Sequence, residues 1–389
     1  MCLNKLGLKD WFFAIGIWFS AFAGLLDESV NKVALYIVLP FLFLLTFFSH
    51  KSLRSNRYMN LLSFLFIWIL FSVLWASNLQ YAMVQVNQIL GSFLLCFIFS
   101  VKGQEEKNLP WIYFSFLVVL LGDWYYAYNH MFNVIEFGVD RLDDLKLNAN
   151  TFGYHTFYAT FAAFILGEWN IKGKRIMHIV FLLMIPLSFV TAIYTASRQI
   201  LIIQIPLILL LLYGRYFKSG TLKVKLSFII LFFIGLILFV PKALDVYNGS
   251  RLQERSELDV KDDIRGKLVQ DAIKVGNENF PFGVGANNYM LHSFSHHFSH
   301  NTYLELYANE GVLGVFIYVY LIVLFLSIQW KRYRLSKDIM YFYFFVAGFI
   351  FFIDGFFYVF YPHLWLISFL ILVATHSETY YLNKQTQCI

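Results

Sequence analysis

Charge and cysteine are both scarce in this sequence, and each scarcity excludes a class of protein. Only 14% of the 389 residues are charged while 59% are hydrophobic, a balance that excludes an ordinary soluble globular protein. The three cysteines are Cys2, Cys96 and Cys388, and we expect none of them on the outer side of a membrane. A disulfide framework and a cysteine-based metal site are therefore excluded there. Internal repeats, low-complexity segments and a soluble domain boundary are also missing from the sequence.

Apolar runs near twenty residues dominate what is present. A helix of that length crosses a hydrocarbon core ~30 Å thick with its backbone groups paired internally. The sequence therefore predicts an all-α, polytopic integral membrane protein with about twelve transmembrane helices. We expect these helices at residues 11–26, 31–49, 59–76, 82–101, 110–128, 150–169, 177–194, 198–214, 223–241, 301–328, 339–357 and 361–378. The first is expected to be retained, because no small-residue cleavage site follows it.

The distribution of the basic residues predicts the topology. The net charge is +6, and most of the 30 Lys and Arg residues fall in alternate short loops, as the positive-inside rule requires. We therefore expect both termini in the cytoplasm and no nucleic-acid partner. The predicted organisation is transmembrane helices one to nine over 1–241, a large extracytoplasmic loop with short amphipathic helices over 242–300, and the last three transmembrane helices with a cytoplasmic tail over 301–389.

Two outer arginines each have more than one interpretation. A short amphipathic helix is predicted near 262–275, with Lys267 and Asp271 on its solvated face. Arg265 lies on the opposite face, where the residues three, four and seven positions later are Leu268, Val269 and Ala272. Arg198 begins an apolar helix at the expected outer boundary, where the positive-inside rule disfavours it. Each arginine either snorkels to water or binds an anionic partner.

The stretch from 281 to 314 contains the remaining candidates. In the PFGVG turn, Gly283 and Gly285 indicate either a tight connection, which we favour, or a phosphate cradle. His292, His296, His297 and His300 could bind zinc, but no carboxylate stands within the run, so a metal site is disfavoured. His300 differs because Asn301 and Glu305 follow it, with Asn309 at four-residue spacing. A polar stripe at a membrane boundary indicates function, and histidine suits a general base.

The order of these motifs resembles a known family. An Arg opening a mid-chain helix (TASRQ), a second Arg in an outer loop (DDIRGKLV), the PFGVG turn and the HNTYLELYANEGVLG stretch together resemble the O-antigen ligase and O-antigen polymerase superfamily. The NANTFG stretch, residues 148–153, is similar to that family's entry to a middle helix. The resemblance in topology spans most of the chain, while the motifs cover roughly 148–153 and 195–315.

The resemblance implies a membrane-embedded, GT-C-like glycosyltransferase in the bacterial cytoplasmic (inner) membrane, with its active site outside. Such an enzyme takes a glycan from an undecaprenyl-diphosphate-linked donor and gives it to a growing glycan (polymerase) or to a lipid A-core sugar (ligase), without metal or other cofactor. Arg198 and Arg265 match the family's diphosphate-binding arginines, and His300 matches the histidine proposed to act on the acceptor hydroxyl. If the alignment slips, His297 takes that place. Polymerase is slightly favoured over ligase, and a polysaccharide flippase is the alternative of another class, although it predicts internal repeats.

Overall fold

The described part of the chain is helical and contains no β-strand, in a computed structural model of the protein. It comprises residues 7–23, 28–49, 55–130, 148–169, 173–195, 198–218, 220–227, 229, 230, 241, 248, 253, 264–294 and 296–387. The all-helical class is confirmed. Helix overlaps every predicted membrane window. Most of window 223–241 and most of the predicted outer loop before residue 264 lie outside the described residues. The count of about twelve spans and the domain boundaries therefore stay predictions.

Six helical spans in the described residues are long and apolar enough to cross a membrane. They are Glu28–Ser49, Arg57–Trp75, Leu79–Lys102, Glu106–His130, Lys174–Thr195 and Thr302–Ser336. The α-helices of the described residues are α1 (Leu8–Ala23), α2 (Glu28–Val33), α3 (Leu39–Ser49), α4 (Arg57–Ser72), α5 (Leu79–Lys102), α6 (Leu109–His130), α7 (Ala149–Glu168), α8 (Lys174–Thr195), α9 (Arg198–Leu212), α12 (Ile264–Glu278), α13 (Tyr289–His292), α14 (Thr302–Ser336), α15 (Ile339–Asp354) and α16 (Leu364–Gln387).

Asparagine side chains start several of these helices. Asn56, Asn78, Asn148 and Asn301 each accept hydrogen bonds from two backbone amides of the first helical turn. These amides have no partner within the helix, so the cap replaces a bond that would otherwise go to water. The beginnings of α4, α5, α7 and α14 are thus set by the residue just before each apolar run.

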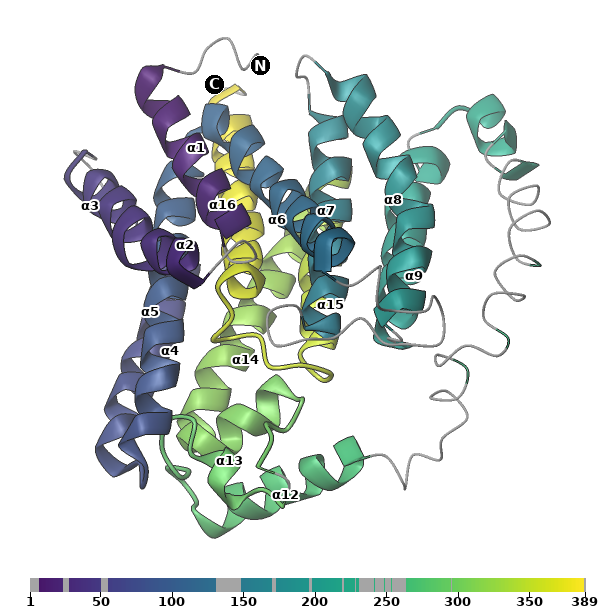
Figure 1. Cartoon of the computed structure of the whole chain (residues 1–389). Helices are drawn as coiled ribbons and strands as arrows, with labels where there is room; N and C mark the ends of the chain where they lie inside the picture. The colour runs from purple at the N-terminus through teal and green to yellow at the C-terminus, as the bar shows by residue number, and fades with distance from the viewer. Residues whose placement is uncertain are drawn as a thin grey trace.

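The helices form a bundle with two distinct ends (Figure 1). The short helices α12 and α13 lie at one end, hereafter the α12 end, whereas α1 begins and α16 ends at the opposite, terminal end (Figure 1). Helix α7 packs against α6, α8, α9 and α16, and nearly all its side chains are buried. A helix that is buried all round belongs to the core of the bundle.

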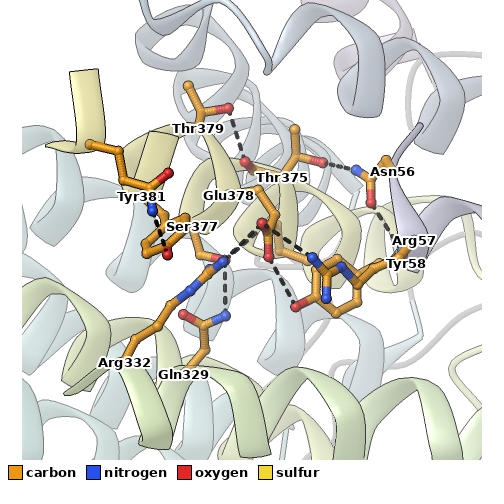
Figure 2. Close-up of polar contacts among 12 residues, drawn as sticks. Asn56, Arg57, Tyr58, Gln329, Arg332, Thr375, Ser377, Glu378, Thr379 and Tyr381 are labelled. Atoms are coloured by element: carbon orange, nitrogen blue, oxygen red, sulfur yellow. Dashed lines mark hydrogen bonds and ion pairs between the residues drawn. The ribbon is translucent and has the colours of Figure 1, made fainter. Parts of the chain in front are cut away.

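A polar cluster holds the terminal end together (Figure 2). Glu378 on α16 accepts a hydrogen bond of 2.9 Å from Arg332 on α14 and one of 3.3 Å from the Tyr58 hydroxyl on α4. Arg57 lies 3.9 Å from the same carboxylate. We call these four residues the Glu378 cluster. It joins three helices, and α14 then extends from this anchored end to the α12 end, where the candidate site lies (Figure 1).

Candidate functional site

Helix α14 is broken within the NEGVLG stretch, at the α12 end. Gly311 has φ 72° and ψ −164°, a backbone conformation that is essentially restricted to glycine. Such a break frees backbone groups that a continuous helix would pair, and buried groups of this kind need other partners. One of them, the carbonyl of Glu310, accepts a hydrogen bond of 2.8 Å from the indole of Trp68 on α4. The other partners come from the loop before the helix.

The PFGVG turn docks onto this break. The amides of Val284 and Gly285 donate to the carbonyls of Ala308 and Asn309 at 2.9 and 2.8 Å, and the amide of Val312 donates to the carbonyl of Pro281 at 3.0 Å. A Cβ on Gly283 would lie 2.5 Å from the carbonyl oxygen of Asn309, and one on Gly311 would overlap the carbonyl oxygen of Pro281. Glycine therefore allows two backbones to approach to hydrogen-bonding distance.

The amides of the two turn glycines already have partners in this arrangement. Gly283 donates to the carbonyl of Asn279 at 2.9 Å, and Gly285 donates to Asn309. Both bonds favour the tight connection over the phosphate cradle, because a cradle needs free amides. A supporting role of Gly283 and Gly285 in substrate binding stays a prediction.

A buried carboxylate fixes the backbone just before His300. Glu305 is 2% exposed, and it accepts hydrogen bonds from the Ser299 amide at 2.6 Å and the Asn309 side-chain amide at 3.1 Å. Asn309 also accepts a bond of 2.7 Å from the amide of Tyr289 on α13. The predicted Glu305–Asn309 stripe is therefore a network that ties the histidine stretch, α13 and α14 together.

His300 stands at the beginning of α14, immediately before its cap. Asn301 accepts hydrogen bonds from the amides of Tyr303 and Leu304 at 3.0 and 3.1 Å. His300 itself has φ 56°, and its ring centroid lies 4.3 Å from that of Phe298. The cap on one side and the Ser299–Glu305 bond on the other hold the backbone of His300 in one place, which is what a positioned base requires.

The other three histidines have looser surroundings. His292, at the end of α13, and His297 are exposed, and the exposed His296 bonds through Nδ1 to the carbonyl of Met290 at 3.1 Å. Within the described residues, no three His, Cys, Asp or Glu side chains come together as metal ligands would. The expectation of a metal-independent site is untested.

Helix α12 presents the predicted apolar face to the protein. Leu268 and Ala272 are buried on that face, and Arg265 on the same face is partly buried. The Tyr289 hydroxyl donates to the carbonyl of Leu268 at 2.8 Å, and burial raises the pKa of Tyr289, so the hydroxyl stays a neutral donor. Arg265 lies close enough to the Tyr154 hydroxyl on α7 for its charge to act on it.

The solvated face of α12 differs in detail from the prediction. Asp271 accepts a hydrogen bond of 3.1 Å from the Phe294 amide, which connects α12 to the histidine stretch. Lys274 lies 3.9 Å from Glu278 one turn later. Asp271 therefore bonds to a backbone amide of the histidine stretch, while the Lys274–Glu278 pair follows the four-residue spacing of a solvated helix face.

Arg198 is the first residue of α9, and α9 begins at the α12 end (Figure 1). Its side chain lies outside the described part of the structure. Helix α9 packs against α7, the helix whose Tyr154 lies near Arg265. The helix that carries Arg198 therefore adjoins α7, and the charge of Arg265 acts on a tyrosine of that same helix.

Tyr358 is a central residue of this region that the sequence did not indicate. It lies in the segment between α15 and α16, and its ring centroid is 5.3 Å from that of Tyr154 and 5.9 Å from that of Phe298. Its carbonyl accepts a hydrogen bond of 2.6 Å from Thr302, the first residue of α14. Tyr358 therefore connects the neighbourhood of Arg265 with that of His300. Nothing in the spacing of YVFYPH marks this tyrosine out, because its partners are distant in sequence.

A comparison with models of protein families gives a match. Residues 179–319 match the family model described as O-antigen ligase, and no curated protein matches the chain. The matched range contains Arg198, Arg265 and His300 together with the interlocked turn and helix break. Residues 179–319 thus support the resemblance to the O-antigen ligase and O-antigen polymerase superfamily, and together with the apolar helices they indicate a multi-pass inner-membrane protein with a glycan-transfer function.

Proposed function

We propose that the protein is a metal-independent glycosyltransferase that moves a glycan from an undecaprenyl-diphosphate-linked donor to a sugar hydroxyl at the outer face of the cytoplasmic membrane, acting as a surface-polysaccharide polymerase. The observation that carries the proposal is the surroundings of His300 at the α12 end. The Glu305 network and the Asn301 cap of α14 fix the backbone on either side of His300, and this residue falls within the range that matches the family model. The family match supports lipid-linked glycan and acceptor substrates in general, and the roles below are our assignment.

Arg198 and Arg265 bind the donor diphosphate in this proposal. Negative charge on the leaving diphosphate grows as the glycosidic bond breaks, so groups that stabilise it lower the barrier. Guanidinium groups stay charged and donate bidentate hydrogen bonds to phosphate oxygens, and a membrane boundary of low dielectric strengthens both effects. The partly buried Arg265, on the inward face of α12, suits this role better than a fully hydrated arginine.

His300 accepts the proton of the acceptor hydroxyl. The hydroxyl oxygen forms the new bond to the anomeric carbon of the donor, the bond from that carbon to the diphosphate oxygen breaks, and the diphosphate leaves with the electron pair. One positioned base contributes typically ~10²–10⁴-fold to such a rate. Asn301 and Glu305 are positioning residues, because they act on the backbone on either side of His300.

Complementation of a strain that lacks the native gene tests the proposal. Arg198→Ala, Arg265→Ala and His300→Ala should each abolish long surface glycan while the protein remains in the membrane. His292→Ala is the matched control, because this histidine lies in the same stretch with its ring exposed. Normal surface glycan from all three variants overturns the proposal.

The form of the glycan that accumulates without the protein separates the two members of the superfamily. Surface glycan limited to one repeat unit supports the polymerase. Long glycan that remains on the lipid carrier supports the ligase, the second candidate, which the description of the matching family model favours. Movement of a lipid-linked sugar across liposomes without new glycosidic bonds supports a flippase instead.

A further inference from the structure

A buried pair of ionisable side chains lies between α6 and α7, outside the range that matches the family model. Asp123 accepts a hydrogen bond of 2.8 Å from Nδ1 of His155. The two side chains are 1% and 10% exposed. Charged and polar groups at membrane depth are expensive, and they commonly line a substrate path. Helix packing alone is the competing explanation, and it predicts no effect on substrate recognition.

The geometry of this pair leaves one ring nitrogen for another molecule. Because Nδ1 of His155 is bonded to Asp123, the nitrogen available to a further partner is Nε2. Asp123 holds the ring in one tautomer and one orientation, as a second group does for many binding and catalytic histidines. Within the described chain, the second carboxylate oxygen of Asp123 has no hydrogen-bond partner, so this oxygen can still accept a hydrogen bond.

The pair is connected to the α12 end along one face of α7. Thr151 and His155 are four residues apart and so share a face, and Thr151 is the more exposed of the two. The Thr151 hydroxyl lies 3.1 Å from that of Tyr358. This face therefore leads inward from the outer end of α7 to the buried pair.

Tyr358 brings this face next to the proposed base. Its ring centroid is 5.9 Å from that of Phe298, the ring that contacts His300, and 5.1 Å from that of His363. His363 in turn lies near His155. Tyr358 thus lies beside the Thr151 hydroxyl, the His363 imidazole and the ring that contacts His300.

We propose that Asp123, His155, Thr151 and Tyr358 form a subsite for a sugar ring of the acceptor glycan. A sugar presents hydroxyls that both donate and accept, together with apolar C–H faces that pack on aromatic rings. The subsite has groups for both features, since Thr151 and His155 offer hydrogen bonds and Tyr154 and Tyr358 supply aromatic rings. His155 Nε2 bonds to a hydroxyl of the acceptor, and Asp123 is a positioning residue. This inference rests on the proposed glycan transfer.

The test measures transfer kinetics with the purified full-length protein in lipid nanodiscs, with a synthetic undecaprenyl-diphosphate repeat unit as donor and a separate oligosaccharide as acceptor. His155→Gln should raise the acceptor KM by about 2- to 10-fold, the effect of losing one hydrogen bond, while the donor KM changes little. Asp123→Asn and Thr151→Val should raise the acceptor KM less. Thr151→Val changes a residue that is only partly buried, so it is the variant less disturbing to the fold. His376→Gln is the matched control, because His376 is also buried but bonds to Tyr113 at 3.0 Å toward the terminal end.

Each outcome decides for or against the subsite. A selective rise in acceptor KM, absent from His376→Gln, supports it. An unchanged acceptor KM in His155→Gln and Thr151→Val, or an equal rise for donor and acceptor, overturns the subsite while the glycan transfer of the unmodified protein stands. Absence of transfer by the unmodified protein overturns the proposed function, and the subsite with it.

Discussion

Substitution of Gly311 by alanine tests the interlock between the PFGVG turn and the α14 break. The new methyl group would overlap the carbonyl oxygen of Pro281, and the backbone at this position is one that alanine avoids. The turn must then move away from the helix, or the helix must straighten. Either change disturbs the bonds from Val284 and Gly285 to the carbonyls at the break.

The magnitude follows from these two effects. The backbone conformation alone costs of order 1–3 kcal/mol for a residue other than glycine. Each backbone hydrogen bond lost between the turn and the helix adds about 0.5–1.5 kcal/mol. We therefore expect Gly311→Ala to destabilise the protein by about 2–5 kcal/mol, depending on how far the turn relaxes. Since the turn connects to the histidine stretch, transfer activity should fall as well.

Gly173→Ala is the matched control for backbone strain. Gly173 has φ 93°, and a Cβ there would meet no atom within 4 Å, so this variant carries the conformational cost without the clash. The assay is thermal unfolding in detergent, monitored by size-exclusion chromatography of the heated samples. The apparent midpoint temperatures rank the variants by stability, because membrane proteins rarely unfold reversibly. If Gly311→Ala loses no more stability and no more activity than Gly173→Ala, the interlock has no energetic importance and the reasoning is refuted.

Two other substitutions address the ends of α14. Glu378→Ala removes the shared acceptor of Arg332, Arg57 and Tyr58 and should lower stability by about 1–3 kcal/mol in the same thermal assay. The folded fraction of this variant should keep its transfer activity. A loss of activity without a loss of stability would contradict a purely structural role of Glu378. Glu305→Gln leaves one acceptor oxygen for two donors, the Ser299 amide and the Asn309 side-chain amide, so one of the two bonds is lost. It should reduce the transfer rate by about 10- to 100-fold with little change in donor KM. An unchanged rate in purified protein would show that Glu305 does not position His300.

The elements that depend on local sequence could be predicted. Runs of apolar residues indicate helices because a membrane leaves the backbone no other way to satisfy its polar groups. The amphipathic helix expected near 262–275 corresponds to α12, Ile264–Glu278, because its apolar spacing is a property of the helix itself. The Asn301 cap likewise needs only the residues that follow it.

The break and the pairings across the fold could not be predicted in the same way. NEGVLG is compatible with an uninterrupted helix, and only the docked PFGVG turn gives the Gly311 conformation its partners. Asp123 and His155 belong to different helices, and neither residue has a local pattern that points to the other. The contacts of Tyr358 similarly depend on how α7, α14 and α16 pack, which the periodicity of each helix does not determine.

The most direct test of the central claim is the transfer rate of the purified protein with His300→Gln, measured beside His292→Gln on the same lipid-linked donor. Both substitutions remove an imidazole from one short stretch, so they differ only in the position of the ring. We expect His300→Gln to be slower than the unmodified protein by ~10²–10⁴-fold, and His292→Gln to be close to it. Equal rates for the two variants would contradict the assignment of His300 as the base.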